Sequence, residues 1–253
     1  MTKLHNFAKL LTLFKSHTFI DIEKVKKELG LSTASAYRYL SDFESIGLLE
    51  KKSPSNYVLG SLIIELDRNI RENDPLIQSA ISFMIEIAHL YKESVLVLSR
   101  LYGEDKVLCV HQVKGENCNL NISYERGKTM EIFKGATSKS ILAWLTENKI
   151  EEIYKKHDIE ISKTTHHKSY ESFYKNLQEI RKNKVCITYS ELDTDVYGIA
   201  SPIFFKNKLI GSLSIVVPGI RKDHLKKISD KIYRTSLQIS GKIETLQLLL
   251  SQE

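Results

Sequence analysis

Apolar residues recur at helical spacing in three short stretches near the start of the chain. The first, residues 4–16, has the i, i+3, i+4 and i+7 spacing of an amphipathic helix. A second helix is predicted to begin after Asp21 as its N-cap and to end at Gly30. A third is predicted over residues 33–45, with Ser32 as its N-cap. Two short helices separated by about three residues form the layout of a helix-turn-helix.

The stretch that follows the third helix predicts a wing. Residues 48–59 have the pattern of a strand, a polar turn and a second strand, and Lys51 and Lys52 lie where a wing could touch backbone phosphates. A recognition helix presents its N-terminal residues to base edges and phosphates. The sequence therefore predicts a DNA-binding surface made of Ser32, Thr33, Ser35, Tyr37, Arg38, Lys51 and Lys52.

The rest of the chain alternates between helical and strand patterns. Residues 61–73 predict a linker helix, and Asp74-Pro75 is a helix start because Asp caps and Pro fits the first helical position. Strands are predicted over 94–101, 106–112, 184–190, 196–205 and 209–217, and further helices over 137–146, 147–156, 169–183 and 222–250. This pattern predicts an α+β domain over residues 74–253, with an antiparallel sheet flanked by helices, behind a winged helix-turn-helix domain over residues 1–60.

Length and charge agree with two domains and a polyanionic partner. The chain has 253 residues and a formal net charge of +6, and its first sixty residues hold nine Lys and Arg residues against six Asp and Glu residues. That excess of three fits a nucleic-acid partner without establishing one. No apolar run reaches the roughly 18 residues of a membrane span, and the start of the chain lacks a signal-peptide cleavage site. We therefore expect a cytoplasmic protein with no membrane partner.

Chemistry-bearing motifs are absent from the pattern. Cys109, Cys118 and Cys186 are odd in number and widely spaced, which argues against a disulfide framework, although redox sensing by Cys186 stays open. The adjacent His166 and His167 do not point two ligands to one side of a helix. No nucleophile elbow or zinc-protease motif is present. We predict no catalytic residue, no metal and no cofactor.

Several short segments together resemble a known family along nearly the whole chain. They are Ser35-Ala36-Tyr37-Arg38-Tyr39-Leu40, Gly47-Leu48-Leu49-Glu50, Tyr57-Val58-Leu59-Gly60, the small-residue stretch 135–143, Glu191 and Ile199-Ala200-Ser201-Pro202-Ile203. Their order and spacing resemble those of the IclR-type bacterial regulators. The resemblance implies a GAF-like effector domain, operator DNA as a partner, and homodimers that pair into tetramers. It also implies repression of catabolic genes in response to a small organic acid.

The resemblance also implies an effector pocket between the small-residue stretch and the sheet. Small residues at the start of a helix leave backbone N–H groups available to a carboxylate. Lys139, on the same helix, could supply a charge to the pocket, but a position at the helix surface near the pocket mouth is favoured. Carried over position by position, the pocket lining would be Ala136, Thr137, Thr188, Gly198, Ser214 and Val216.

Two other classes of function remain open at this point. A winged helix also serves as a protein–protein adaptor, because fold alone does not decide function. A cytosolic enzyme with an accessory winged helix is the other alternative, but the chain shows no set of nucleophile, base and orienting residue. Replacement of Arg38 separates a DNA-binding regulator from the adaptor, since only the regulator loses DNA affinity.

Overall fold

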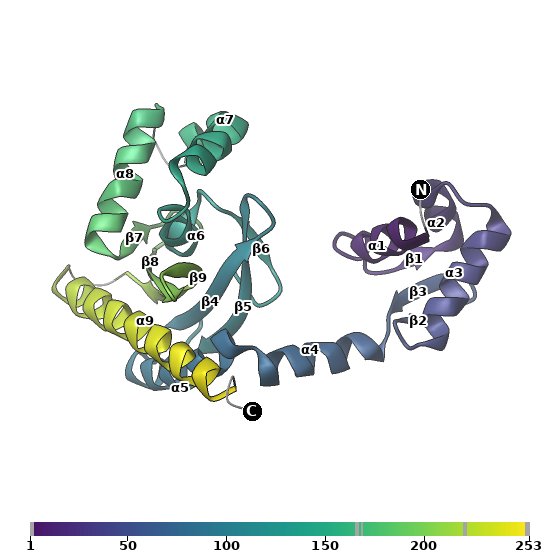
Figure 1. The fold of residues 1–253 in the computed structure, drawn as a ribbon, viewed down its shortest axis with the longest axis horizontal. Coiled ribbons are helices and arrows are strands. Elements are labelled where there is room, and N and C mark those ends of the chain that lie inside the picture. The colour runs from purple at the N-terminus through teal and green to yellow at the C-terminus, as the bar shows by residue number, and fades with distance from the viewer. Residues whose placement is uncertain (1–2, 165–166, 168, 220–221, 251–253) are drawn as a thin grey trace. The chain divides into compact units, whose positions relative to one another are not determined.

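The computed structural model describes residues 3–164, 167, 169–219 and 222–250. It divides into two compact units, Met1–Asn73 and Asp74–Glu253 (Figure 1). Each unit has its own buried apolar core. The two units are described separately below.

The first unit consists of helices and a small antiparallel sheet. Its elements are α1 (Lys3–Leu13), β1 (Ile20–Asp21), α2 (Ile22–Leu29), α3 (Thr33–Ser45), β2 (Leu49–Lys51), β3 (Asn56–Leu59) and α4 (Ser61–Asn73). The three strands lie in the order β1-β3-β2. The three helices before α4 and the β2–β3 hairpin are confirmed, but α1 ends at Leu13, three residues before its predicted end. The short strand β1 was not predicted, because it is defined by pairing with Asn56 and Tyr57 far along the chain.

The predicted helix boundaries in this unit follow from local capping. The Asp21 carboxylate accepts a hydrogen bond from the N–H of Lys24 at 2.7 Å, and Ser32 Oγ accepts one from the N–H of Ser35 at 3.2 Å. Gly30 ends α2 with φ 65°, a left-handed conformation that glycine adopts without strain. These side chains fix the turn between α2 and α3, so the helix pair is specified by its own sequence.

The second unit is an α+β domain built on one sheet. Its elements are α5 (Pro75–Leu90), β4 (Val95–Tyr102), β5 (Lys106–Lys114), β6 (Thr129–Glu131), α6 (Gly135–Leu142), α7 (Glu147–Thr164), α8 (Tyr170–Asn183), β7 (Cys186–Tyr189), β8 (Val196–Phe205), β9 (Lys208–Pro218) and α9 (Lys222–Leu250). The six strands are antiparallel, in the order β6-β5-β4-β9-β8-β7. The predicted fold class is confirmed.

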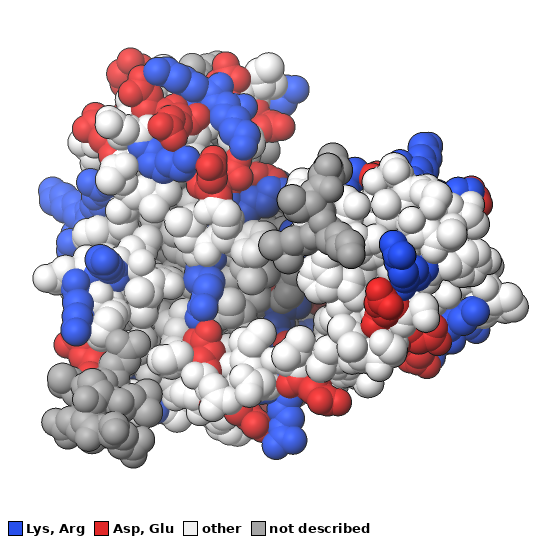
Figure 2. Space-filling model, turned by 45° about the vertical axis from the view of Figure 1, so that its right-hand side comes forward, with Lys and Arg blue, Asp and Glu red and all other residues white. Residues whose placement is uncertain are grey.

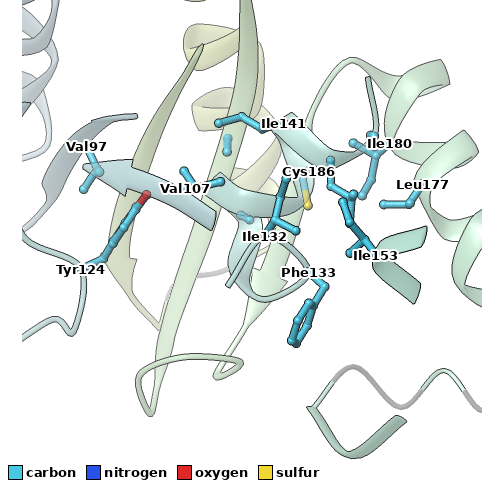
Figure 3. Close-up of a cluster of buried hydrophobic side chains, with 14 of the residues drawn as sticks. Val97, Val107, Tyr124, Ile132, Phe133, Ile141, Ile153, Leu177, Ile180 and Cys186 are labelled. Carbon is cyan, nitrogen blue, oxygen red and sulfur yellow. The ribbon is translucent and has the colours of Figure 1, made fainter. Parts of the chain in front are cut away.

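Helices cover both faces of this sheet. Figure 1 shows α5 and α9 on one face and α6, α7 and α8 on the other. Successive residues of a strand point to opposite faces, so Leu96 and Leu98 pack with α5 and α9, whereas Val95 and Val97 pack on the opposite side. Figure 3 shows part of that opposite cluster, where Ile141, Ile153, Leu177 and Ile180 come together from three helices. Burial of both faces explains why Val95, Leu96, Val97 and Leu98 form an uninterrupted apolar run in β4.

Three features of the second unit differ from the predictions. The strand β6 was not predicted. The helix α6 runs from Gly135 to Leu142 instead of 137–146, because Arg181 of α8 binds the carbonyl oxygens of Ala143 and Leu145 and ends the helix there. The helix α7 extends to Thr164 through a kink at His157. The interpretation of the pair His166-His167 cannot be followed here, because His166 lies outside the described residues.

Candidate functional site

The helix α3 has one buried face and one exposed face. Ala36, Leu40 and Phe43 are buried in the core of the first unit. Tyr37, which is 50% exposed, and Arg38 lie on the other face. The phenol and the guanidinium are therefore available to an external partner, and both can donate hydrogen bonds to phosphates or base edges.

Two of the residues predicted to contact DNA also build the start of this helix. Ser32 Oγ accepts from the N–H of Ser35 and also lies 3.1 Å from Ser35 Oγ, to which it donates. Thr33, the first residue of α3, is exposed. Ser32 and Ser35 thus hold the end of the helix that presents Thr33, Tyr37 and Arg38.

The two wing lysines are exposed and make only weak contacts with other residues. Lys52 Nζ lies 2.7 Å from a Glu50 carboxylate oxygen, and both side chains are more than half exposed. Lys51 Nζ lies 5.8 Å from the centre of the Tyr57 ring. Exposed ion pairs of this kind contribute about 0–1 kcal/mol. A phosphate can therefore replace Glu50 as the partner of Lys52 at little cost.

Charge around α3 is mixed, which limits how it can approach a polyanion. Asp42 and Glu44 are exposed in the C-terminal half of the helix, whereas Arg38 is in its N-terminal half. Figure 2 shows basic and acidic side chains interspersed over the face it presents, without a broad patch of one sign. The basic residues of α3 and of the β2–β3 hairpin are thus Arg38, in the N-terminal half of the helix, and Lys51 and Lys52 in the hairpin.

The second unit contains a small cavity between α6, the sheet and two loops. It is lined by Ile122, Tyr124, Gly135, Ala136, Thr137, Thr188, Glu191, Leu192, Asp193, Val196, Gly198 and Val216, and its volume is about 30 Å³. Five of the six residues predicted as effector contacts line it. Sequence positions up to eighty residues apart are thus brought together at one site, with α6 as a wall and β7, β8 and β9 as the floor.

Ser214 is the predicted pocket residue that does not line the cavity. Its Oγ accepts a hydrogen bond from Thr137 Oγ1 at 2.8 Å and donates one to the Val97 carbonyl oxygen at 3.3 Å. The side chain is fully buried. Ser214 therefore orients Thr137, which itself borders the cavity.

The N-terminus of α6 is bound by a carboxylate of the chain itself. Glu191 accepts a hydrogen bond from the N–H of Gly135 at 3.3 Å, and its other oxygen lies 2.7 Å from Lys139 Nζ. The side chains of Lys139 and Glu191 are 9% and 11% exposed. The expectation that Lys139 lies at the helix surface is wrong, because this ion pair draws it into the interior next to the cavity.

The roof of the cavity consists of residues that were not predicted from the sequence. Ile122 and Tyr124 come from a segment with no helical or strand periodicity, and Leu192 comes from a turn. Figure 3 shows the Tyr124 hydroxyl pointing toward the strands that carry Val97 and Val107. Burial raises the pKa of Tyr124, and the nearby Ser99 hydroxyl opposes that effect in part. No local signal could have identified these three residues, since each reaches the cavity through tertiary folding.

Two larger hollows of the second unit hold none of the predicted residues. One, of about 520 Å³, lies at Leu90–Ser94 and the start of α9. The other, of about 410 Å³, lies at Asp74–Leu76, Arg100 and the β9 strand. Both are open surface grooves, whereas the small cavity beside α6 brings five of the six predicted residues together and is therefore the better candidate for specific recognition.

The structure offers little support for other classes of site. Within the described part of the chain, no three His, Cys, Asp or Glu side chains meet in a way that could hold a metal ion. Among the same residues, no helix is long and apolar enough to cross a membrane.

Comparison with known families and proteins gives a consistent result. The family described as "Bacterial transcriptional regulator IclR C-terminal" matches residues 70–241. The HTH-type transcriptional regulator KipR of Bacillus subtilis (strain 168) is 23% identical over 238 residues, which cover 92% of this chain and 94% of the relative. The probable HTH-type transcriptional regulator ArcR of Halobacterium salinarum is 22% identical over 232 residues, 87% of this chain and 84% of the relative.

Solved structures share the fold over almost the full length. The Thermotoga maritima IclR superposes with a TM-score of 0.71 at 20% identity and covers 95% of this chain and 97% of its own. An IclR homologue from Microbacterium hydrocarbonoxydans, complexed with 4-hydroxybenzoate, has a TM-score of 0.79 at 17% identity and covers 95% and 99%. At these identities the likeness concerns the fold.

Proposed function

This chain belongs to the IclR family of bacterial transcriptional regulators, and from that membership we propose that it is a repressor that binds operator DNA under the control of a small organic acid. Its relatives are named regulators, not enzymes. In this proposal residues 1–60 bind DNA, residues 61–73 form a linker helix and residues 74–253 bind the effector. The observation that carries the DNA-binding part is the exposed face of α3 with Tyr37 and Arg38 beside the wing.

The contacts divide by role. Arg38 is suited to a guanine edge, because its guanidinium can donate two parallel hydrogen bonds. Thr33 and Tyr37, and Ser32 and Ser35 at the helix start, are suited to phosphates and neighbouring bases. Lys51 and Lys52 contact the backbone, where they supply affinity without sequence information. The alternative role as a protein–protein adaptor predicts no dependence on base sequence.

We propose a homodimer, or a pair of dimers, as the active form. The helix α4 has no buried residue, and Leu66 and Ile70, which are 50% and 52% exposed, line up with half-buried Ile63 on one face. An apolar stripe on an otherwise polar helix is stabilised by burial against a partner. A second copy of the helix supplies such a stripe and also pairs two DNA-binding units for a near-palindromic operator.

The effector site in this proposal is the cavity beside α6. The first N–H groups of a helix have no acceptor within the helix, and Ala136 and Thr137 line the cavity at this end of α6. The N–H groups at this end of α6 together favour an anionic group on the ligand. The complex of the Microbacterium homologue with 4-hydroxybenzoate supports an organic acid as the class of ligand.

The effector needs only a modest preference to act as a switch. A ligand shifts an equilibrium by its differential affinity for two states. A tenfold change in operator occupancy requires about 1.4 kcal/mol of difference. Binding of a single small acid is sufficient for an effect of this size.

The proposal is tested by DNA selection followed by effector screening. Purified protein is mixed with fragments of its source genome, and bound fragments are sequenced over a series of salt concentrations. The proposal predicts a few enriched sites with dyad symmetry that withstand excess competitor DNA. Binding that is equal for all sequences and disappears as salt rises is the signature of phosphate contact alone and would contradict it. A panel of small carboxylic acids, including 4-hydroxybenzoate, is then added to find one that releases the selected site.

A further inference from the structure

The segment between β7 and β8 forms a tight, internally braced loop over the cavity. It runs from Ser190 to Asp195, and both end residues adopt left-handed conformations, with φ 49° and 58°. The N–H of Asp195 donates to Ser190 Oγ at 2.8 Å, and the N–H of Ser190 donates to the Val196 carbonyl oxygen at 3.0 Å. The two ends are thus joined to each other, so Leu192 and Asp193 can move without separating the ends of the loop.

Leu192 of this loop fills the space at the start of α6. A Cβ atom placed on Gly135 would lie 2.5 Å from Leu192 Cδ1 and 3.1 Å from Cγ. The leucine side chain therefore rests directly on the glycine backbone at the cavity wall. Only a glycine allows this approach, and any larger residue at position 135 would displace the leucine.

Asp193 ties the same loop to the roof of the cavity. Its two carboxylate oxygens each lie 3.1 Å from the backbone nitrogen of Ser123, which donates to them, and Ser123 Oγ donates to one of them as well. Ser123 lies between Ile122 and Tyr124, the two roof residues. A single carboxylate thus connects the two loops that enclose the cavity.

The volume enclosed by these contacts is too small for an organic molecule. The cavity measures about 30 Å³, which is room for about two water molecules, because one water needs about 10–15 Å³ of such space. Pockets that hold small-molecule ligands measure about 300–1,000 Å³. The residues predicted to contact an effector are therefore assembled, but the space for the effector is occupied by Leu192 and the roof.

We infer that Ser190–Asp195 is a lid, that the Ser123–Asp193 contacts are its latch, and that Leu192 decides which molecules fit beneath it. The inference rests on the proposed function for the identity of the occupant, a small acid. Glu191 stays bound to Lys139 and Gly135 and serves as the pivot, while Leu192 and Asp193 swing outward. A ligand must release the latch to enter, so selection by size occurs at Leu192.

The test measures opening of the lid in the absence of any effector. A cysteine is introduced on the cavity floor by Val216→Cys in a Cys118→Ser background, and its alkylation by iodoacetamide is followed by mass spectrometry. Burial raises the pKa of Cys109 and of Cys186 to about 12, so these thiols stay protonated and react slowly. Asp193→Ala removes the latch, Ser123→Ala removes only the hydroxyl contact, and Thr194→Ala changes an exposed lid residue as a matched control.

The lid predicts a graded response. Alkylation at position 216 should accelerate about tenfold or more with Asp193→Ala, which removes every latch contact to a charged acceptor. It should accelerate by a smaller factor with Ser123→Ala and not at all with Thr194→Ala. Equal rates in all four proteins, with circular dichroism unchanged, would overturn the lid. Alkylation rates that follow the prediction support the lid even if no acid binds the wild-type protein or Leu192→Ala. Absence of acid binding in both proteins would instead contradict the proposed class of effector.

Discussion

The Nζ of Lys139 and a carboxylate oxygen of Glu191 lie 2.7 Å apart, although the two residues are 52 positions apart in the chain. The pair connects α6 to the lid, and it lies next to the cavity that the family resemblance implied. Because both side chains are almost completely buried, neither charge has water to replace its partner. Loss of either partner would therefore leave an uncompensated buried charge beside the cavity.

Removal of Lys139 should destabilise the second unit. Lys139→Ala leaves the Glu191 carboxylate with only the Gly135 N–H as a partner, and loss of one member of a buried pair costs about 3–5 kcal/mol. Urea unfolding measures the change through Trp144, the only tryptophan in the sequence, which reports on the second unit. Lys175→Ala, at an exposed position of α8, controls for the lost charge. A decrease equal to that of the control would contradict a structural role for the pair.

Stability should depend on pH through His157, at the kink of α7. Its Nε2 lies 2.9 Å from Asp105 and its Nδ1 lies 2.8 Å from Glu160, and both contacts are hydrogen bonds only when both nitrogens carry protons. Burial lowers the pKa of His157, but the hydrogen bonds and charges of Asp105 and Glu160 outweigh it and raise the pKa above 6.5. The hydrogen bond from Lys156, and then that from His157, lower the pKa of Asp105 to about 2.

The direction of the pH effect follows from these shifts. A raised histidine pKa contributes stability that is complete below the unfolded pKa, about 6.5, and is lost as pH rises through the folded pKa. The lowered pKa of Asp105 contributes stability above its unfolded pKa of about 3.8, and this stability is lost as pH falls toward 2. Urea unfolding between pH 5.5 and about 8.5 should show the wild-type protein losing stability relative to His157→Gln. Parallel pH profiles for the two proteins would argue against a charged His157.

Gly198→Ala should abolish the response to an effector while leaving the fold intact. The added Cβ would lie 3.0 Å from Thr188 Oγ1 and 3.3 Å from Ala136 Cβ, so it takes up space in a cavity of about 30 Å³. Calorimetric titration with the acid found by the screen should show loss of binding, whereas operator affinity without the acid should be unchanged. Gly241→Ala is the matched control, because its Cβ meets no atom within 4 Å. Undiminished acid binding by Gly198→Ala would place the effector elsewhere.

Ile70→Lys should dissociate the proposed dimer. The substitution places a charge in the apolar stripe of α4, and the cost of burying that charge against a second copy favours the monomer. Analytical ultracentrifugation of wild type and variant measures the change in mass. Asn69→Lys adds the same charge at an exposed neighbouring position and should leave the mass unchanged. If both variants sediment like the wild type, the stripe is not the interface.

Local signals in the sequence predicted much of the fold. Asp21, Ser32 and Asp74 were correctly identified as helix caps because a cap acts within three residues of its own position. The strands predicted over 196–205 and 209–217 leave a short connection between them, in which Lys206 and Asn207 take positive φ. Alternation and turns likewise placed the long strands of the sheet.

Contacts between distant segments could not be predicted in the same way. Lys139 was expected at the helix surface near the pocket mouth, because nothing in the sequence around it indicates its partner Glu191. The end of α6 was misplaced because Arg181 lies on another helix. The cavity was located by family resemblance, but its roof and its closed state depend on Leu192 and Tyr124, which no motif marks. Contacts between side chains that are distant in the sequence can be identified only from the three-dimensional structure.

The central claim is that the exposed face of α3 reads operator DNA, and Arg38 tests it most directly. Fluorescence anisotropy with the selected operator compares wild type, Arg38→Ala and the exposed-lysine control Lys175→Ala at one fixed salt concentration. Loss of a base-contacting arginine costs about 1–3 kcal/mol, so Arg38→Ala should weaken operator binding about 5- to 150-fold and relax the preference over random DNA. Operator affinity and preference that match those of Lys175→Ala would contradict the account.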